Sequence, residues 1–99
     1  MVLKEIIKEL KTSKNPVYKM LRKGENSHIL AIGFNKDMLL KKHKSDIPAR
    51  ILVIKGEVVY NSDNVSATLG LYNEYEIPVG ESHWVTANED SMMLVMKGN

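Results

Sequence analysis

Residues 43–58, HKSDIPARILVIKGEV, contain the features that decide the fold. The stretch begins at a histidine, passes through a proline and enters an alternating apolar run that ends at Lys55-Gly56-Glu57. Alternate side chains of a strand share one face, so His43, Ser45 and Ala49 are expected to lie on one side with the apolar residues that follow. Glycine reaches positive φ without steric cost, which places the reversal of a hairpin at Gly56.

Similar short runs continue on both sides of this stretch and are separated by turn residues. The expected strands are 28–34, 38–43, 49–54, 57–60, 65–72, 75–78, 83–87 and 91–96. Turn signals every eight to twelve residues or so, with a period of two in the apolar pattern, are typical of an antiparallel sandwich or barrel. The sequence therefore predicts an all-β fold.

The first segment has a different period. Apolar residues recur at helical spacing, at Leu3, Ile6, Ile7 and Leu10, and lysines and glutamates fill the other face. This pattern predicts a helix over residues 3–12, which ends before Pro16. So short a helix is marginal alone in water and is expected to pack on the sheet. We expect residues 1–15 to form this helical segment and residues 16–99 to form one β domain.

Composition fits a small globular protein. The chain has 99 residues, of which 43% are hydrophobic and 26% charged, and it has no cysteine. Disulfides, thiolate metal ligands and a cysteine nucleophile are thereby excluded. The opening residues are charged throughout, unlike a signal peptide or a membrane span. A cytoplasmic protein without membrane contact is the simplest interpretation.

The charge is unevenly distributed along the chain. Residues 1–50 hold twelve Lys or Arg and five acids, a net +7, whereas residues 51–99 hold two and seven, a net −5. A basic half can bind phosphate backbones, and the alternative is that the two halves neutralise each other or face water. The lysines are scattered, and Tyr18 is the one aromatic residue among them before Phe34, so no nucleic-acid partner is expected.

The opening stretch also fits part of a known motif, which runs glycine, five residues, His-x-His, three or four residues, Glu, six residues, Gly. Aligned on Gly56, the chain has Asp37 in the leading glycine place and His43 in the first histidine place. Ser45 stands in the second histidine place and Ala49 in the glutamate place. In this spacing the chain resembles the cupins, small jelly-roll barrels built as a double-stranded β-helix.

The second cupin motif runs glycine, five residues, Pro-x-Gly, two residues, His, three residues, Asn. Here Tyr72 replaces the glycine, Pro78 and Gly80 match, His83 matches, and Ala87 stands in the asparagine place. If the resemblance holds, the shared face is the barrel interior and the second histidine enters it from a neighbouring strand.

The resemblance covers roughly residues 30–96. It is strongest to a small-cupin group whose first motif keeps one histidine, followed by Pro-Ala, and whose second motif ends H-x-V-x-A-x-E-D-S. That ending is present as His83, Val85, Ala87, Glu89, Asp90 and Ser91. The resemblance implies a fold but no particular reaction, because one fold hosts many chemistries.

A mononuclear metal in this fold usually has three histidines, with or without a glutamate. The matching positions supply two histidines, and three or four protein ligands are the norm for iron, manganese or zinc. A third ligand would have to come from outside the motifs, from His28, Glu57 or Glu81. The alternatives are a divergent metal-dependent oxygenase or isomerase, a hydrogen-bonded structural pair of histidines, and a metal-free pocket.

We predict the metal-free pocket, formed by His43, Ser45, Ala49 and His83 and binding a small polar or anionic ligand. No cofactor is expected, and under the metal alternative a divalent transition metal would bind His43 and His83. Lys41 has the parity to point toward the pocket, although a solvated strand with lysines on both sides is the simpler interpretation.

A homodimer is the expected assembly. Leu52, Ile54 and Trp84 have the parity to point out of the barrel, and the Met-rich run 92–96 is apolar on both sides. Exposed apolar patches usually mark interfaces, and twofold dimers are the commonest assembly.

Overall fold

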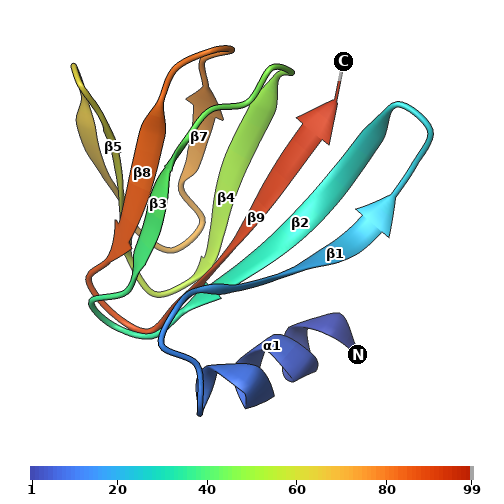
Figure 1. Ribbon diagram of the computed structural model, residues 1–99, viewed down its shortest axis with the longest axis vertical. Coiled ribbons are helices and arrows are strands. Elements are labelled where there is room, and N and C mark those ends of the chain that lie inside the picture. The colour runs from blue at the N-terminus through green and yellow to red at the C-terminus, as the bar shows by residue number, and fades with distance from the viewer. Residues whose placement is uncertain (99) are drawn as a thin grey trace.

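A computed structural model describes residues 1–98 and has one helix and nine strands in that range (Figure 1). The elements are α1 (Val2–Leu10), β1 (Val17–Lys23), β2 (Ser27–Phe34), β3 (Leu39–His43), β4 (Ala49–Lys55), β5 (Val58–Ser62), β6 (Ser66–Leu69), β7 (Glu74–Ile77), β8 (His83–Ala87) and β9 (Ser91–Gly98). The all-β prediction with a leading helix is confirmed. The expected strand over residues 65–72 is shorter than predicted, because a turn begins after Leu69.

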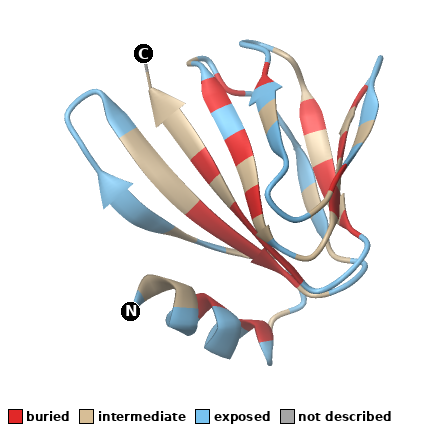
Figure 2. Ribbon diagram, turned by 180° about the vertical axis from the view of Figure 1, so that it is seen from behind, coloured by how far each residue is buried: buried red, intermediate tan, exposed pale blue. Residues whose placement is uncertain are grey.

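Two antiparallel sheets form a jelly-roll sandwich. The larger has the order β1-β2-β9-β4-β7 and the smaller has the order β3-β8-β5-β6. The apolar run at the end of the chain becomes β9, which lies between β2 and β4 at the centre of the larger sheet. The main core fills the space between the sheets, and buried residues gather on β4, β8, β9 and one half of β2 (Figure 2).

Helix α1 packs on the outer face of the larger sheet, as its amphipathic pattern predicts. Ile6 and Leu10 are buried there against Ala31 and Met92. The helix ends at Leu10, whose carbonyl accepts a 2.7 Å hydrogen bond from the side-chain amide of Asn35. At nine residues, the helix in the described range is too short to cross a membrane.

Turn positions of the two motifs adopt the left-handed backbone that glycine favours. Gly56 and Gly80 have φ of 76° and 79°. Asp37 and Tyr72, which stand in the leading glycine places of the two motifs, have φ of 73° and 67°. The backbone therefore keeps the turns of the motifs where the glycines themselves have been replaced, at a cost in strain that is larger for tyrosine than for aspartate.

The end of the second motif ties two of these turns together. The Ser91 hydroxyl accepts the backbone N–H of Glu57 at 3.0 Å, and the Asp90 carboxylate accepts that of Lys36 at 2.8 Å. These contacts hold the β4–β5 turn and the β2–β3 connection against the start of β9. The motif residues at this end of the barrel thus have a structural role.

Ion pairs link the basic half of the chain to the acidic half. Arg50 pairs with Glu74 and Glu76 on the outer face of the larger sheet, and Lys42 pairs with Asp63. All of these side chains are exposed, so each pair contributes little to stability. The arrangement agrees with the hypothesis that the halves neutralise each other.

The outward-pointing apolar residues lie on two different sheets. Leu52 and Ile54 are on the outer face of the larger sheet, where the α1 cluster partly covers Ile54. Trp84 lies on the outer face of the smaller sheet, beneath the ammonium group of Lys42 at 5.4 Å. The parity predicted from the sequence holds, but these residues do not form one surface.

Candidate functional site

His43 and His83 meet because strand β3 contains an irregularity. In the β3–β8 ladder, Leu40 is opposite Val85 and the next aligned pair is His43 with His83. Between these two pairs β3 therefore contains one more residue than β8. Without this bulge a lysine would stand opposite His83. The centroids of the two imidazole rings are 4.4 Å apart.

Each imidazole is held by a backbone carbonyl two residues earlier. His43 Nδ1 lies 2.8 Å from the Lys41 oxygen, and His83 Nδ1 lies 3.0 Å from the Glu81 oxygen. A carbonyl can only accept, so Nδ1 carries the hydrogen in both rings. In the neutral state each ring therefore presents Nε2 as a hydrogen-bond acceptor.

The histidines line a cavity of about 40 Å³ between the sheets. Its other lining residues are Leu30, Ile32, Leu40, Ser45, Ile51, Ile77, Val85, Met93, Val95 and Lys97. Every fully buried side-chain nitrogen or oxygen of the described residues has a hydrogen-bond partner. His83 is only 2% exposed and its Nε2 forms no hydrogen bond within residues 1–98, so this atom is not fully buried and borders the cavity.

The stretch His43–Ala49 crosses from one sheet to the other, so the expectation that it forms one face of one strand is wrong. Ser45 lies in the connection, and its hydroxyl donates to the Ile47 carbonyl at 2.8 Å. Ala49 begins β4 in the larger sheet, is 2% exposed in the core, and does not line the cavity. Of the four expected pocket residues, the cavity brings together His43, Ser45 and His83.

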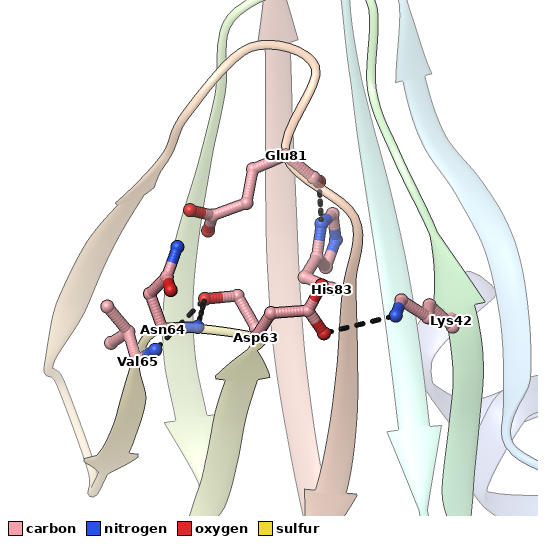
Figure 3. A network of polar contacts seen from close by, with 7 residues as sticks. Lys42, Asp63, Asn64, Val65, Glu81 and His83 are labelled. Atoms are coloured by element: carbon pink, nitrogen blue, oxygen red, sulfur yellow. Dashed lines mark hydrogen bonds and ion pairs between the residues drawn. The ribbon is translucent and has the colours of Figure 1, made fainter.

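A buried tyrosine supports the second histidine. The Tyr60 ring is stacked with His83 at 5.1 Å, and its hydroxyl donates to the Glu81 carboxylate. Burial, followed by this carboxylate, raises the pKa of Tyr60 above its usual range. Figure 3 shows that the Glu81 carboxylate points away from the His83 ring while its backbone carbonyl faces the ring.

The environment of His83 favours the neutral imidazole. Burial lowers the pKa of His83 below its ordinary value; the Glu81 carbonyl opposes the shift, and the neighbouring His43 adds to it. At neutral pH the ring is therefore an acceptor at Nε2.

Because burial depresses the pKa of His83 in the folded state, the unfolded chain binds this proton more readily. Stability is then fully present above about pH 6.5, the ordinary histidine pKa, and is lost as the pH falls through the lower folded value. We expect urea denaturation to give a smaller unfolding free energy at pH 5 than at pH 7.5. His83→Gln should reduce this difference. Equal pH dependence in wild type and His83→Gln would contradict the assignment.

A wider hollow of about 490 Å³ opens beside the inner cavity. The two share Leu30, Ile32, Leu40, His43 and Lys97 as lining residues. Asn15, Pro16, Tyr18, Leu39, Lys41 and Lys42 line the hollow alone. It thus lies between the β1–β2 end of the larger sheet and β3, one of the two edge strands of the smaller sheet. Tyr18 remains 65% exposed there.

Lysines supply the charge around this opening. Lys42 is paired with Asp63 at 3.2 Å (Figure 3), whereas Lys41 and Lys97 make no ion pair with any residue in 1–98. No aspartate or glutamate is among the lining residues of either space. The opening is therefore cationic. Lys41 lines the outer hollow but not the inner cavity, and the bulge in β3 means that simple alternation does not explain its position.

Residues 1–98 contain no group of three or more His, Asp or Glu side chains placed to hold a metal ion. Glu57 lies at the opposite end of the barrel, where its carboxylate accepts from Asn88. The Glu81 carboxylate is bound to Tyr60, and His28 lines neither space. With Ser45 and Ala49 in the remaining ligand places, the residues present do not fit a resident metal centre of three or four protein ligands.

Sequence reasoning missed Lys97. It follows Met93 and Val95 at a period of two on the inward face of β9, so alternation would have placed its side chain inside. Tyr60 follows Val58 in the same way on β5. Both signals were present, but neither residue belongs to a motif position.

The sequence matches no protein-family model and no curated protein. Its structure is similar to that of a cupin superfamily protein from Desulfitobacterium hafniense, with a TM-score of 0.80 and 15% identity over 87% of this chain and 79% of that one. An RmlC-like cupin from Desulfovibrio desulfuricans has a TM-score of 0.79 and 22% identity, over 86% of this chain and 83% of that one. A conserved protein of unknown function from Streptococcus pyogenes has a TM-score of 0.77 and 17% identity, over 88% of this chain and 76% of that one. The chain has the cupin fold, as its motif spacing predicted.

Proposed function

We propose that this cupin-fold protein binds a small anionic ligand at the mouth of its barrel, beside His43 and His83, without a resident metal ion. The observation that carries the proposal is the charge of the opening. Lys41 and Lys97 line it, and no acidic side chain of residues 1–98 does. Cationic clefts with low-dielectric walls attract and concentrate anions.

The volumes of the inner cavity and the outer hollow indicate which part of the ligand each could hold. A cavity of about 40 Å³ holds a few waters or one small chemical group, since one water needs about 10–15 Å³ measured in this way. The adjoining hollow of about 490 Å³ falls within the roughly 300–1,000 Å³ of small-molecule sites. The body of the ligand would lie in the hollow, and one polar group would reach the histidines.

Among the expected pocket residues, His43 and His83 would contact the ligand, and Ser45 would line the inner cavity beside them. Ala49 is left out of the proposed contacts because it does not line either space. Ala49 has only a methyl group, and the Ser45 hydroxyl already donates to the Ile47 carbonyl. Of the four expected pocket residues, the two histidines are therefore the ones with polar atoms available to a ligand.

The test uses inorganic phosphate and acetate as probes, with the imidazole signals of His43 and His83 followed by NMR. Both signals should shift with millimolar anion, and the shift should be largely lost in the Lys41→Gln/Lys97→Gln double variant. Lys44→Gln is the matched control, since Lys44 is exposed and lines neither space. Equal responses in the double variant and the wild type would refute anion binding at this opening.

We also propose a cytoplasmic homodimer. The supporting feature is the outer face of the larger sheet, where Leu52 and Met96 remain partly exposed. Trp84 is on the other sheet and is not part of this surface. Light scattering should give the mass of a dimer, and a monomer mass that does not change with concentration would contradict this assembly.

A further inference from the structure

We infer that the ligand is an amphipathic hydroxy acid: a carboxylate with a hydroxyl beside it and a hydrocarbon body. This inference rests on the proposed anion-binding function and names its ligand class. Three separate features of the opening lead to it, namely its charge, the tautomers of its histidines and the apolar wall of the hollow.

The charge requires an anionic group near Lys97. This residue lines both the inner cavity and the outer hollow. Burial lowers the pKa of His83, and the positive charge of Lys97 lies close enough to that ring to help lower it. Lys41 adds a second cation on the side of the hollow. A carboxylate between them would accept charge-assisted hydrogen bonds, the stronger kind.

The tautomers require a hydrogen-bond donor. With Nδ1 of His43 and His83 bonded to backbone carbonyls, both Nε2 atoms are acceptors in the neutral rings. A carboxylate offers only acceptors and would face these lone pairs unfavourably. A hydroxyl next to the carboxylate can donate to one Nε2 while the carboxylate stays with the lysine.

The wall of the hollow requires a hydrocarbon body. Leu30, Ile32 and Leu40 continue from the inner cavity into the hollow, and Tyr18 and Leu39 extend the apolar wall outward. Tyr18 and Leu39 are 65% and 48% exposed, although neither is needed to cover the core. An alkyl or aryl group of the ligand would remove this surface from water.

Calorimetric titration at pH 8, where an ordinary histidine is neutral, tests each feature with matched compounds. We expect 2-hydroxyhexanoate to bind most tightly. Hexanoate, without the hydroxyl, should bind about fivefold more weakly, as for one lost hydrogen bond. Lactate should bind about fourfold more weakly for each methylene group that it lacks relative to 2-hydroxyhexanoate. The uncharged 2-hydroxyhexanamide should bind far more weakly than 2-hydroxyhexanoate, because it loses the charge-assisted hydrogen bonds to the lysines.

Variants assign the effects to residues. Leu39→Ser should weaken 2-hydroxyhexanoate and leave lactate unchanged, and His43→Phe should remove much of the advantage of hydroxyhexanoate over hexanoate. Lys44→Gln should bind all four compounds as the wild type does, and thermal unfolding should show that each variant is folded.

The outcomes separate this inference from the proposed function. If phosphate, acetate, hexanoate and 2-hydroxyhexanoate bind equally and all depend on Lys97, the hydroxy-acid inference is overturned and anion binding stands. Equal binding of hexanoate and 2-hydroxyhexanoate alone also overturns it, because the histidine acceptors would then have no role. If no anion shifts the imidazole signals, both proposals fall.

Discussion

Gly56→Ala is expected to lower the free energy of unfolding by about 3 kcal/mol or more, from left-handed strain of about 1–2 kcal/mol and overpacking of about 1–3 kcal/mol. Gly56 has φ of 76°, and a Cβ there would lie 2.3 Å from the Asp90 carbonyl oxygen and 2.4 Å from Ser91 Oγ. The obstacle is backbone and a serine hydroxyl that already holds the turn at Glu57. The clash with Ser91 could be relieved only by breaking the hydrogen bond between its hydroxyl and the Glu57 backbone N–H. Urea denaturation measures the loss.

Gly80→Ala is the matched control for Gly56→Ala. Gly80 has φ of 79°, and an added Cβ meets nothing within 4 Å. Its cost should be the left-handed strain alone, about 1–2 kcal/mol. If the two alanine variants were equally stable, the close approach of Asp90 and Ser91 would have no energetic importance.

Gly33→Ala should lower the unfolding free energy by about 1–3 kcal/mol through overpacking beneath the helix. Gly33 lies on β2 under α1, and a Cβ there would come within 2.4 Å of Ile6 Cγ2 and 2.9 Å of Leu10 Cδ1. The backbone at Gly33 has no left-handed strain, so the effect isolates the contact between helix and sheet. Denaturation measures the loss, and hydrogen exchange should show that protection falls first in α1.

Two further variants test the mechanism at Gly33. Gly70→Ala should be nearly neutral, because the nearest atom to its Cβ would be Asn73 Oδ1 at 3.7 Å. Ile6→Ala removes the atom that clashes, so Gly33→Ala should cost less in that background than alone. Additive costs would show that the contact with Ile6 is not the cause of the loss at Gly33.

The fold could be predicted because its turns and its alternation are local signals. The motif spacing aligned Asp37, Gly56, Tyr72 and Gly80 with the glycine places of the two motifs, and all four have positive φ. The turn at Tyr72 was nevertheless missed, because the alternation of residues 65–72 predicted a strand up to that residue. The helix was found for a similar reason, since its apolar period needs no partner to be recognised.

Other features depend on contacts that are distant in sequence. Strand β1 was not predicted, because Lys19, Arg22 and Lys23 interrupt its apolar pattern; it forms by pairing with β2, with a register shift after Met20. The bulge that aligns His43 with His83 exists only in the β3–β8 ladder. Lys97 lines the site because β9 places it at the barrel mouth. It is not a position of either motif, so the motif spacing could not identify it.

The placement of β9 has a consequence for how the protein is made. Strand β9 forms ladders with β2 on one side and β4 on the other, and these two strands have no direct pairing. During synthesis, the β1–β2 hairpin and the β4–β7 pair can form, but they stay separate until Ser91–Gly98 leaves the ribosome. The core between the sheets therefore closes late, through contacts between residues far apart in the chain, which slow folding. Until then the emerging chain carries unpaired strand edges, which makes it prone to aggregation.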